Sequence, residues 1–309
     1  MVKKIKIYKN FEINKFHKKS ILLIGNFDGL HLGHQKLFNQ AMKFKNRFKT
    51  KIGVLTFDPI PKMFFNKHLE NYRISNFNQK VDYFKKFGVD FLINKKFDKQ
   101  FSKISANDFI NKILNKKLNI KFLFVSNNFR FGYKREGDVK LLKFNQKLYD
   151  YKLIKPSPLK INNKIVSSTE IRKLLETGKI KLANKMLDRY WSIEGKIQKG
   201  RKLGKKIGFP TCNIDIKDYI IPKVGVYCVR AKIEKNIKNY NGIANIGYRP
   251  TFNQNKILLE VNLFNFSGNI YNKKLSVDFV KFIRGEKKFN GIDQLRNQIK
   301  KDILVAKNN

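Results

Sequence analysis

The residues Gly25-Asn26-Phe27-Asp28-Gly29-Leu30-His31-Leu32-Gly33-His34 mark the point where a predicted strand turns into a predicted helix. The apolar run 21–24 before them is typical of a buried strand, and residues 37–42 after them carry apolar side chains on one helical face. The start of such a helix offers free backbone N–H groups and a dipole that favour a phosphate. His31 and His34 point the same way on a starting helix, so both imidazoles could stabilise charge that develops on a phosphate during transfer.

The alternative for this stretch is a polar turn with two solvated histidines. We favour the functional interpretation because the chain has only four histidines and two of them fall in this turn. This interpretation needs support from motifs elsewhere in the chain.

The composition predicts a folded protein without a membrane span. A chain of 309 residues with 42% apolar residues can form two domains or one large domain. No apolar run reaches the length of a membrane helix, and residues 1–10 lack the core of a signal peptide. Cys212 and Cys228 form no C-x-x-C pair, which favours a reduced, cytoplasmic protein without a disulfide framework.

The net charge of +44 raises the question of nucleic-acid binding. The basic residues are 56 Lys and only 11 Arg, and the lysines are spread over the whole chain. Specific readers of nucleic acid rely on Arg for bidentate contacts. Asn, Ile and Phe, which A/T-rich codons encode, are also abundant. We therefore expect compositional drift, no specific nucleic-acid partner, and weak electrostatic binding of polyanions.

The first part of the chain alternates strand-like and helix-like segments, which predicts a doubly wound, Rossmann-like parallel sheet. Ligands of such sheets bind beyond the carboxyl ends of the strands. The expected strands are 21–24, 51–57, 91–93, 122–125 and 151–154, and the expected helices are 77–87, 106–114 (with Ser105 as N-cap), 141–148 and 180–186.

Three further motifs follow predicted strands or open a predicted helix. Thr56-Phe57-Asp58-Pro59-Ile60-Pro61 contains two prolines, which predict an extended loop. Ser126-Asn127-Asn128-Phe129-Arg130-Phe131-Gly132 follows the strand that ends at residue 125, and its two phenylalanines alternate like core residues. Ser167-Ser168-Thr169-Glu170-Ile171-Arg172 offers hydroxyls for a helix N-cap, and these hydroxyls and Arg172 could also bind a phosphate.

The order and spacing of these motifs resemble the prokaryotic bifunctional riboflavin kinase/FMN adenylyltransferases, or FAD synthetases. The H-x-G-H element within G-N-F-D-G-L-H-L-G-H is similar to the signature of nucleotidyltransferases, which activate ATP at the α-phosphorus. The resemblance implies that His31 and His34 are catalytic. It implies ATP binding by Gly25, Phe27, Asp28, Gly33, Asn128, Ser167, Ser168, Thr169 and Arg172. Ile60 stands where the family usually has His and Ser126 where it has Gly, which leaves open a weakened adenylyltransferase.

From Trp191 onward the pattern changes to short strands separated by Gly, Asn and Pro turns, followed by one helix over 292–306. This predicts a small antiparallel β-barrel with a C-terminal helix. We therefore expect a nucleotidyltransferase domain over 1–186 and a second domain over 187–309. The expected strands of the second domain are 192–198, 225–233, 241–246, 258–264 and 275–282.

The second domain contains a glycine-rich stretch that ends in Gly208-Phe209-Pro210-Thr211-Cys212-Asn213. Repeated glycines and nearby lysines suit a loop over phosphates, although such a loop can also be merely flexible. Thr211 and Asn213 are two residues apart, so an extended segment points both oxygens to one side. Hard neutral oxygens of this kind suit a Mg²⁺ that ATP phosphates also hold.

This stretch resembles the riboflavin kinase motif G-[FI]-P-T-A-N, with Cys212 in place of Ala. The resemblance implies that Glu260, in an otherwise apolar strand, takes the proton of the riboflavin 5′-hydroxyl, although Glu260 could also be a structural ion-pair partner. It also implies ATP-binding, flavin-binding and metal-binding residues, which are Gly200, Arg201, Gly204, Lys206, Gly208 and Pro210 for ATP, Arg284 and Phe289 for flavin, and Thr211 and Asn213 for the metal.

The sequence thus predicts an enzyme that phosphorylates riboflavin to FMN and then joins FMN to AMP, with ATP and Mg²⁺. Three alternatives remain: a kinase with a weakened adenylyltransferase domain, a basic nucleic-acid-binding protein, and another H-x-G-H transferase such as one acting on pantetheine phosphate. The kinase motifs argue against the last. No oligomeric state is predicted.

Overall fold

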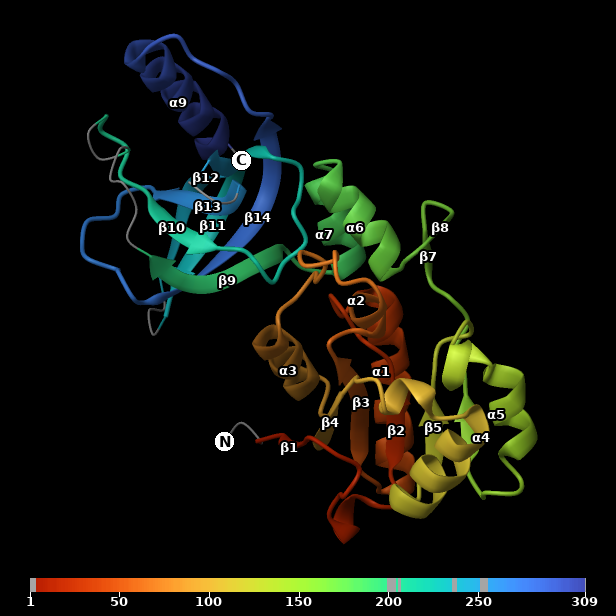
Figure 1. Ribbon diagram of the computed structural model, residues 1–309. Helices are drawn as coiled ribbons and strands as arrows, with labels where there is room; N and C mark the ends of the chain where they lie inside the picture. The colour runs from red at the N-terminus through yellow and green to blue at the C-terminus, as the bar shows by residue number, and fades with distance from the viewer. Residues whose placement is uncertain (1–3, 199–203, 205–206, 235–237, 251–254, 309) are drawn as a thin grey trace. The chain divides into compact units, whose positions relative to one another are not determined.

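The structure, a computed structural model, describes residues 4–198, 204, 207–234, 238–250 and 255–308. The chain forms two compact units. The sheet unit comprises the residues up to Leu69 and Phe77–Ser167, and the barrel unit comprises Glu70–Asn76 and Ser168–Asn309 (Figure 1). This division differs from the expected boundary after residue 186. The two helices that come before the barrel in the sequence, Ser168–Glu176 and Ile180–Leu187, belong to the barrel unit. The functional boundary at 186/187 stays a prediction.

The sheet unit is built on six strands in the order β1-β4-β3-β2-β5-β6. All neighbouring strands are parallel, which confirms the doubly wound sheet. The chain runs to one side of β2 through β3 and β4, and to the other side through β5 and β6, so the order reverses beside β2. The strands are β1 (Lys6–Tyr8), β2 (Ile21–Ile24), β3 (Ile52–Asp58), β4 (Phe91–Lys96), β5 (Phe122–Phe124) and β6 (Lys152–Ile154).

Helices cover both faces of this sheet. Leu22 and Ile24 of β2 belong to one core cluster, and Ile21 and Leu23 belong to the other, as the alternation of side chains along a strand requires. The helical segments are α1 (Leu32–Phe48), α2 (Pro61–Phe65), α3 (Phe77–Lys86), α4 (Ala106–Asp108), the π-helix η3 (Phe109–Lys117) and α5 (Val139–Asn145), with 3₁₀ turns at Lys15–His17, Phe101–Lys103 and Tyr133–Arg135 and a small hairpin of β7 (Lys160–Ile161) and β8 (Lys164–Ile165).

Several predicted elements in the sheet unit need correction. The loop around the two prolines is not extended throughout, because Pro61 is the first residue of α2. Proline suits that position, since its missing N–H is not needed in the first helical turn. The helix expected over 141–148 begins two residues earlier, because Asp138 caps it by accepting a hydrogen bond from the Leu141 N–H (2.9 Å). Ser105 caps α4 as predicted.

The barrel unit is a closed six-stranded antiparallel barrel in the order β10-β13-β12-β11-β14-β9. This confirms the predicted β-barrel with its C-terminal helix α9 (Ile292–Lys307), which packs on β11 and β12 through a small apolar cluster. The strands are β9 (Trp191–Gln198), β10 (Cys212–Asp215), β11 (Gly225–Ile233), β12 (Asn239–Pro250), β13 (Asn255–Leu263) and β14 (Lys274–Arg284). The unit also contains α6 (Ser168–Glu176) and α7 (Ile180–Leu187).

A short segment from the first part of the sequence, Glu70–Asn76, packs with the barrel unit. The buried Trp191 indole N–H donates a hydrogen bond to the Ile74 carbonyl oxygen (2.9 Å), and Asn76 Nδ2 donates one to the Tyr219 hydroxyl (2.7 Å). A buried indole needs an acceptor, and the barrel strands use their own carbonyls in the sheet. Nothing in the sequence predicted that this segment packs with the barrel unit.

Among the helices that the structure describes, none combines the length and the apolar composition of a membrane-spanning segment.

Candidate active sites

The predicted catalytic turn lies directly after β2, where the strand order of the sheet reverses. This is the position where open α/β sheets bind ligands. His31 is the N-cap of α1, and its Nδ1 accepts a hydrogen bond from the His34 N–H (3.4 Å). The two imidazoles stack with a distance of 3.7 Å between ring centroids. The structure therefore brings His31 and His34 together at a helix N-terminus, although His31 caps the helix instead of lying within it.

Close packing of buried side chains holds this turn in a strained backbone conformation. Phe27 (φ 47°) and Leu30 (φ 37°) adopt left-handed conformations, which cost a residue with a side chain roughly 1–2 kcal/mol each. Both side chains are almost fully buried in the sheet-unit core, which offsets that cost. A Cβ atom on Gly33 would lie 3.1 Å from the Val166 carbonyl oxygen and 3.2 Å from the His31 ring. Gly33 thus leaves room for the His31 imidazole, whereas the Phe27 side chain belongs to the core.

Buried polar groups collect near the same edge of the sheet. The Asn26 carbonyl oxygen, just after β2, accepts hydrogen bonds from the Thr56 hydroxyl (3.4 Å) and from Lys80 Nζ (3.3 Å). Asp28 and Lys80 are both more than nine-tenths buried. Ile60, which stands where the family usually has His, is also buried. This end of the sheet thus combines buried charged side chains, Asp28 and Lys80, with the apolar side chain of Ile60.

The loop after β5 contains the predicted nucleotide-binding Asn128. Asn128 is exposed and its Oδ1 lies 3.0 Å from the Ser126 hydroxyl. Phe129 and Phe131 stack on each other and pack against the core of the sheet, as their alternation predicted. The loop therefore presents Asn128 outward from an aromatic base.

The predicted phosphate-binding residues at the start of α6 divide between the two units. Ser167 ends the sheet unit, and Ser168, Thr169 and Arg172 belong to the barrel unit. Arg172 is 8% exposed. Its Nε donates a hydrogen bond to the Tyr72 carbonyl oxygen (2.8 Å), and its guanidinium lies 3.7 Å from the centre of the Tyr72 ring. These contacts fix the direction of the Arg172 side chain.

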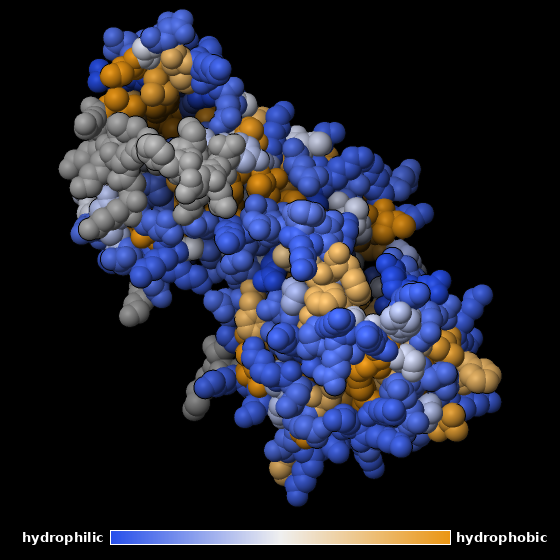
Figure 2. Space-filling model, viewed as in Figure 1, coloured by the Kyte–Doolittle hydropathy of each residue, from blue (hydrophilic) through white to orange (hydrophobic). Residues whose placement is uncertain are grey.

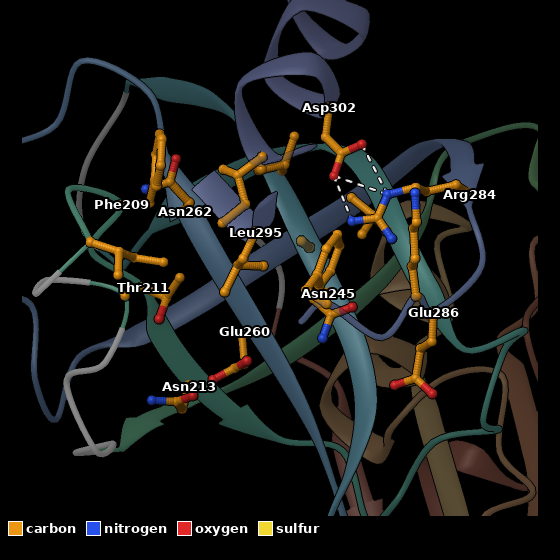
Figure 3. Close-up of a pocket in the computed structure, with 18 of the residues that line it drawn as sticks. Phe209, Thr211, Asn213, Asn245, Glu260, Asn262, Arg284, Glu286, Leu295 and Asp302 are labelled. Carbon is orange, nitrogen blue, oxygen red and sulfur yellow. Dashed lines mark hydrogen bonds and ion pairs between the residues drawn. The ribbon is translucent and has the colours of Figure 1, made fainter. Parts of the chain in front are cut away.

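The barrel unit contains a pocket of about 690 Å³ between the barrel strands and α9. This volume lies in the range of pockets for drug-sized ligands. Its walls combine apolar side chains with a few polar ones, which suits a ligand with a flat aromatic part and a polar part. Its lining includes Gly204, Phe209, Thr211, Asn213, Val226, Ile243, Asn245, Glu260, Asn262, Arg284, Glu286, Phe289, Leu295, Ile299 and Asp302 (Figure 3).

Three polar residues form a row across neighbouring strands in this pocket. Glu260 of β13 is paired with Asn213 of β10 on one side and with Asn245 of β12 on the other. Figure 3 shows the Glu260 and Asn213 side chains side by side. Thr211 also lines the pocket, so Thr211 and Asn213 share one side as the alternation of an extended segment predicted.

Cys212, between these two residues, points the other way. It is buried, and its Sγ–H donates to the Val261 carbonyl oxygen (3.4 Å). Burial raises the pKa of the Cys212 thiol to about 12. The thiol is therefore neutral and behaves as a small core residue, which explains how it can replace the alanine of the family motif.

The amide of Asn213 is suited to a cation. Asn213 is 5% exposed, and within the described residues its Oδ1 accepts no hydrogen bond. A buried acceptor without a donor is costly unless a ligand or ion satisfies it. No group of three or more His, Cys, Asp or Glu side chains in the described part of the chain is placed to hold a metal ion by itself.

The glycine-rich loop before this segment is only partly described. Gly200, Arg201 and Lys206 lie outside the described residues. A Cβ atom on Gly204 would lie 2.4 Å from the Phe209 carbonyl oxygen, so the close turn there requires glycine. Asn262 Nδ2 donates to the Pro210 carbonyl oxygen (2.7 Å), which anchors the segment to β13.

The predicted flavin-binding residues lie in the same pocket as Glu260. The Arg284 guanidinium lies 5.9 Å from the centre of the Phe289 ring. Sequence reasoning gave no role to Asn245, Asn262, Glu286 or Asp302, which also line the pocket. The sequence held one signal for Asp302, since it is an acidic residue on the face of α9 that also carries the apolar Leu295 and Ile299. The pairing of Asn245 with Glu260 depends on strand register, which no short motif reveals.

Comparisons with known proteins match both units. A family model described as FAD synthetase matches residues 13–170, and one described as riboflavin kinase matches residues 187–309. A bifunctional riboflavin kinase/FMN adenylyltransferase from Buchnera aphidicola subsp. Schizaphis graminum is 41% identical, covering 96% of this chain and 95% of the relative. One of the same name from Haemophilus influenzae is 37% identical, covering 95% of each.

A solved structure from Streptococcus pneumoniae, described as a macrolide-efflux protein, superposes with a TM-score of 0.86 at 31% identity and covers 98% of each chain. This structural similarity spans both units. The matches to the two family models and to the curated relatives together establish that the chain belongs to the bifunctional riboflavin kinase/FMN adenylyltransferase family.

Proposed function

We propose that the chain carries two active sites that act in sequence. The barrel pocket transfers the γ-phosphoryl group of ATP to riboflavin and forms FMN. The turn after β2 then helps to join FMN to the AMP part of ATP, which forms FAD and releases pyrophosphate. The row of Asn213, Glu260 and Asn245 in one pocket carries the proposal, because it places a base beside a candidate metal ligand. We assign residues 1–186 to adenylyl transfer and 187–309 to the kinase.

In the kinase site, Glu260 accepts the proton of the riboflavin 5′-hydroxyl as the hydroxyl oxygen attacks the γ-phosphorus and the bond to the β-phosphate oxygen breaks. The apolar walls suit the flavin ring system, and Phe289 and Arg284 position it. Glycines of the loop that precedes Pro210 let the backbone approach the ATP phosphates.

Thr211 and Asn213 fit a Mg²⁺ ion that ATP brings to the site. The buried Oδ1 of Asn213, which has no hydrogen-bond donor among the described residues, supports this assignment. Bound Mg²⁺ supplies charge neutralisation for the transferring phosphoryl group.

In the adenylyltransferase site, an FMN phosphate oxygen attacks the α-phosphorus of ATP, and pyrophosphate leaves. His31 and His34 donate hydrogen bonds to the phosphate oxygens on which charge increases. The N-terminus of α1 adds the favourable dipole. Gly25, Asp28, Gly33, Asn128, Ser167, Ser168, Thr169 and Arg172 are proposed to bind ATP.

A second candidate is a kinase whose adenylyltransferase activity is weakened. Ile60 and Ser126 favour it, since both depart from the family pattern and Ile60 offers no polar group. We further propose that the enzyme works in the cytoplasm, because its two cysteines are buried, free thiols.

The test is to incubate the pure protein with riboflavin and Mg-ATP and to separate the flavins by chromatography over time. The proposal expects FMN first and FAD later. Accumulation of FMN without FAD would favour the weakened adenylyltransferase, and no flavin product would refute the proposal.

A further inference from the structure

A buried ion pair lies behind the proposed flavin-binding arginine. Arg284, the last residue of β14, donates hydrogen bonds from Nε to both carboxylate oxygens of Asp302 (3.0 and 3.1 Å) and from Nη2 to Asp302 Oδ2 (2.8 Å) (Figure 3). The Asp302 side chain is 3% exposed and the Arg284 side chain 22%. The pair therefore joins α9 to the end of β14 inside the pocket wall.

The surrounding bonds fix the orientation of the guanidinium. Gln298, one turn earlier on α9, donates from Nε2 to Asp302 Oδ1 (2.9 Å) and so holds the carboxylate itself. Arg284 Nη1 donates to the Gly285 carbonyl oxygen (2.9 Å). A guanidinium has five N–H groups. These bonds use three of them within the described residues, which leaves one on Nη1 and one on Nη2.

The pair has no net charge, and this bears on what it can bind. A free arginine in a pocket attracts phosphates, whereas an arginine neutralised by a buried carboxylate offers directed N–H donors with little excess charge. Such donors suit the carbonyl oxygens of a neutral heteroaromatic ring. Phe289, beside the guanidinium, and the apolar residues of α9 and β11 suit the face of the ring.

We propose that Asp302 is a positioning residue for flavin binding, which locks Arg284 so that its two remaining N–H groups meet the polar edge of the riboflavin ring system. Asp302 itself acts through Arg284 and not on the substrate. The inference rests on the proposed kinase function of this pocket. It also makes α9 part of the flavin site, since Asp302 and Gln298 both belong to that helix.

The test compares riboflavin kinase kinetics of the full chain with those of Asp302→Asn. The substitution keeps the shape and removes the charge that orients the guanidinium. We expect the KM for riboflavin to rise about ten- to hundredfold, since small misplacements of a positioning group have effects of this size. The KM for ATP and kcat should stay nearly unchanged. A contact that binds riboflavin equally well in the ground state and in the transition state affects the riboflavin KM and not kcat when it is lost. Asp293→Asn, an exposed aspartate on the same helix, is the matched control.

Two further variants separate positioning from general stability. Asp302→Glu keeps the charge but shifts it by one methylene, so its riboflavin KM should lie between those of the parent and of Asp302→Asn. In an Arg284→Gln background, Asp302→Asn should raise the riboflavin KM no further, because the group it positions is gone. Thermal melting shows which variants are folded, and Asp302→Glu alone decides if Asp302→Asn does not fold.

A riboflavin KM of Asp302→Glu or of folded Asp302→Asn equal to that of the parent overturns the proposal. So does an equal rise of the riboflavin and ATP KM values, or a full additive effect in the Arg284→Gln background. A parent protein that does not phosphorylate riboflavin would instead refute the proposed function, so the two failures are distinguishable.

Discussion

The imidazoles of His31 and His34 stack at the start of α1, and we propose that both act in adenylyl transfer. His34→Ala should lower FAD formation from supplied FMN by roughly two to three orders of magnitude, the usual effect of removing one donor to a developing oxyanion. Riboflavin phosphorylation should stay near the parent rate, because the described lining of the barrel pocket includes no residue of this turn. The measurement is the rate of FAD formation from FMN and of FMN formation from riboflavin in the same preparation.

His17→Ala is the matched control for His34→Ala. His17 stacks on Phe91, the first residue of β4, and so lies at the edge of the sheet opposite the proposed site. It should alter stability but neither catalytic rate. Equal loss of both activities in folded His34→Ala would refute the assignment of two sites.

Glu260 decides the kinase assignment at the same scale. Glu260→Gln keeps size and hydrogen bonding but removes the base, so FMN formation should fall by about a hundredfold to ten-thousandfold. The loss is smaller if the transition state is loose, since such a state needs little help from a base. Kinase turnover at saturating riboflavin and Mg-ATP is the measurement, with the exposed Glu176→Gln as control. Parent-like turnover of Glu260→Gln would make Glu260 a structural strand residue.

At the scale of elements, a half-buried carboxylate on the barrel wall links stability to pH. Burial, together with the nearby Glu194, raises the pKa of Asp278 on β14 to about 6, while Arg230 and Arg189 oppose the shift. The folded state therefore holds this proton more tightly than the unfolded chain. The stability gained from protonation is complete below about pH 4 and is lost as the pH rises through about 6.

Asp278→Asn, which cannot ionise, should thus be more stable than the parent at about pH 7.5 and nearly equal to it at about pH 3.5, below the unfolded-state pKa. We expect a gain of about 1–2 kcal/mol at pH 7.5, less than the full shift implies because the side chain is partly solvated and loses its attraction to the arginines. Chemical denaturation at the two pH values measures it, with Asp293→Asn as control. A gain that does not depend on pH would contradict the assigned pKa.

The sequence predicted the elements whose signal is local and missed those that depend on partners far along the chain. β2, α1 and β11 follow from apolar runs and periodicity. β1 was missed because its three residues, Lys6–Tyr8, are mostly exposed and lie at the edge of the sheet. The packing of Glu70–Asn76 with the barrel unit involves hydrogen bonds to residues about a hundred or more positions away, such as the one from the Trp191 indole to the Ile74 carbonyl oxygen, which no local pattern encodes.

At the scale of the whole molecule, the charge of +44 remains to be explained. Figure 2 shows hydrophilic side chains over much of the visible face, and the lysines are spread along the whole sequence instead of forming one cluster. Polyanion binding should therefore be weak, nonspecific and electrostatic, and should fall steeply with salt as counterions are released. Titration of labelled DNA and RNA at low and physiological ionic strength measures this. Tight binding that persists at physiological salt would favour the nucleic-acid alternative.

The two candidate sites differ in how far the sequence could predict them. The two-residue spacing predicted that Thr211 and Asn213 share one side, and the family resemblance implied Glu260, Arg284 and Phe289; the structure brings all five into one pocket. Asn245 could not be predicted, because its place depends on strand register. Asp302 stands out as an acidic residue on the apolar face of α9, but its pairing with Arg284 depends on how α9 docks. In the sheet unit, spacing predicted that His31 and His34 lie together, but not that His31 caps the helix.

The most direct test of the two-site account mixes two variants that each lack one activity. His34→Ala and Glu260→Gln are incubated with riboflavin and Mg-ATP, first separately and then together, and FAD is measured. The account predicts that His34→Ala stops at FMN, that Glu260→Gln makes almost no product from riboflavin, and that the mixture makes FAD through free FMN. FAD formation from riboflavin by either variant alone at the parent rate would contradict it.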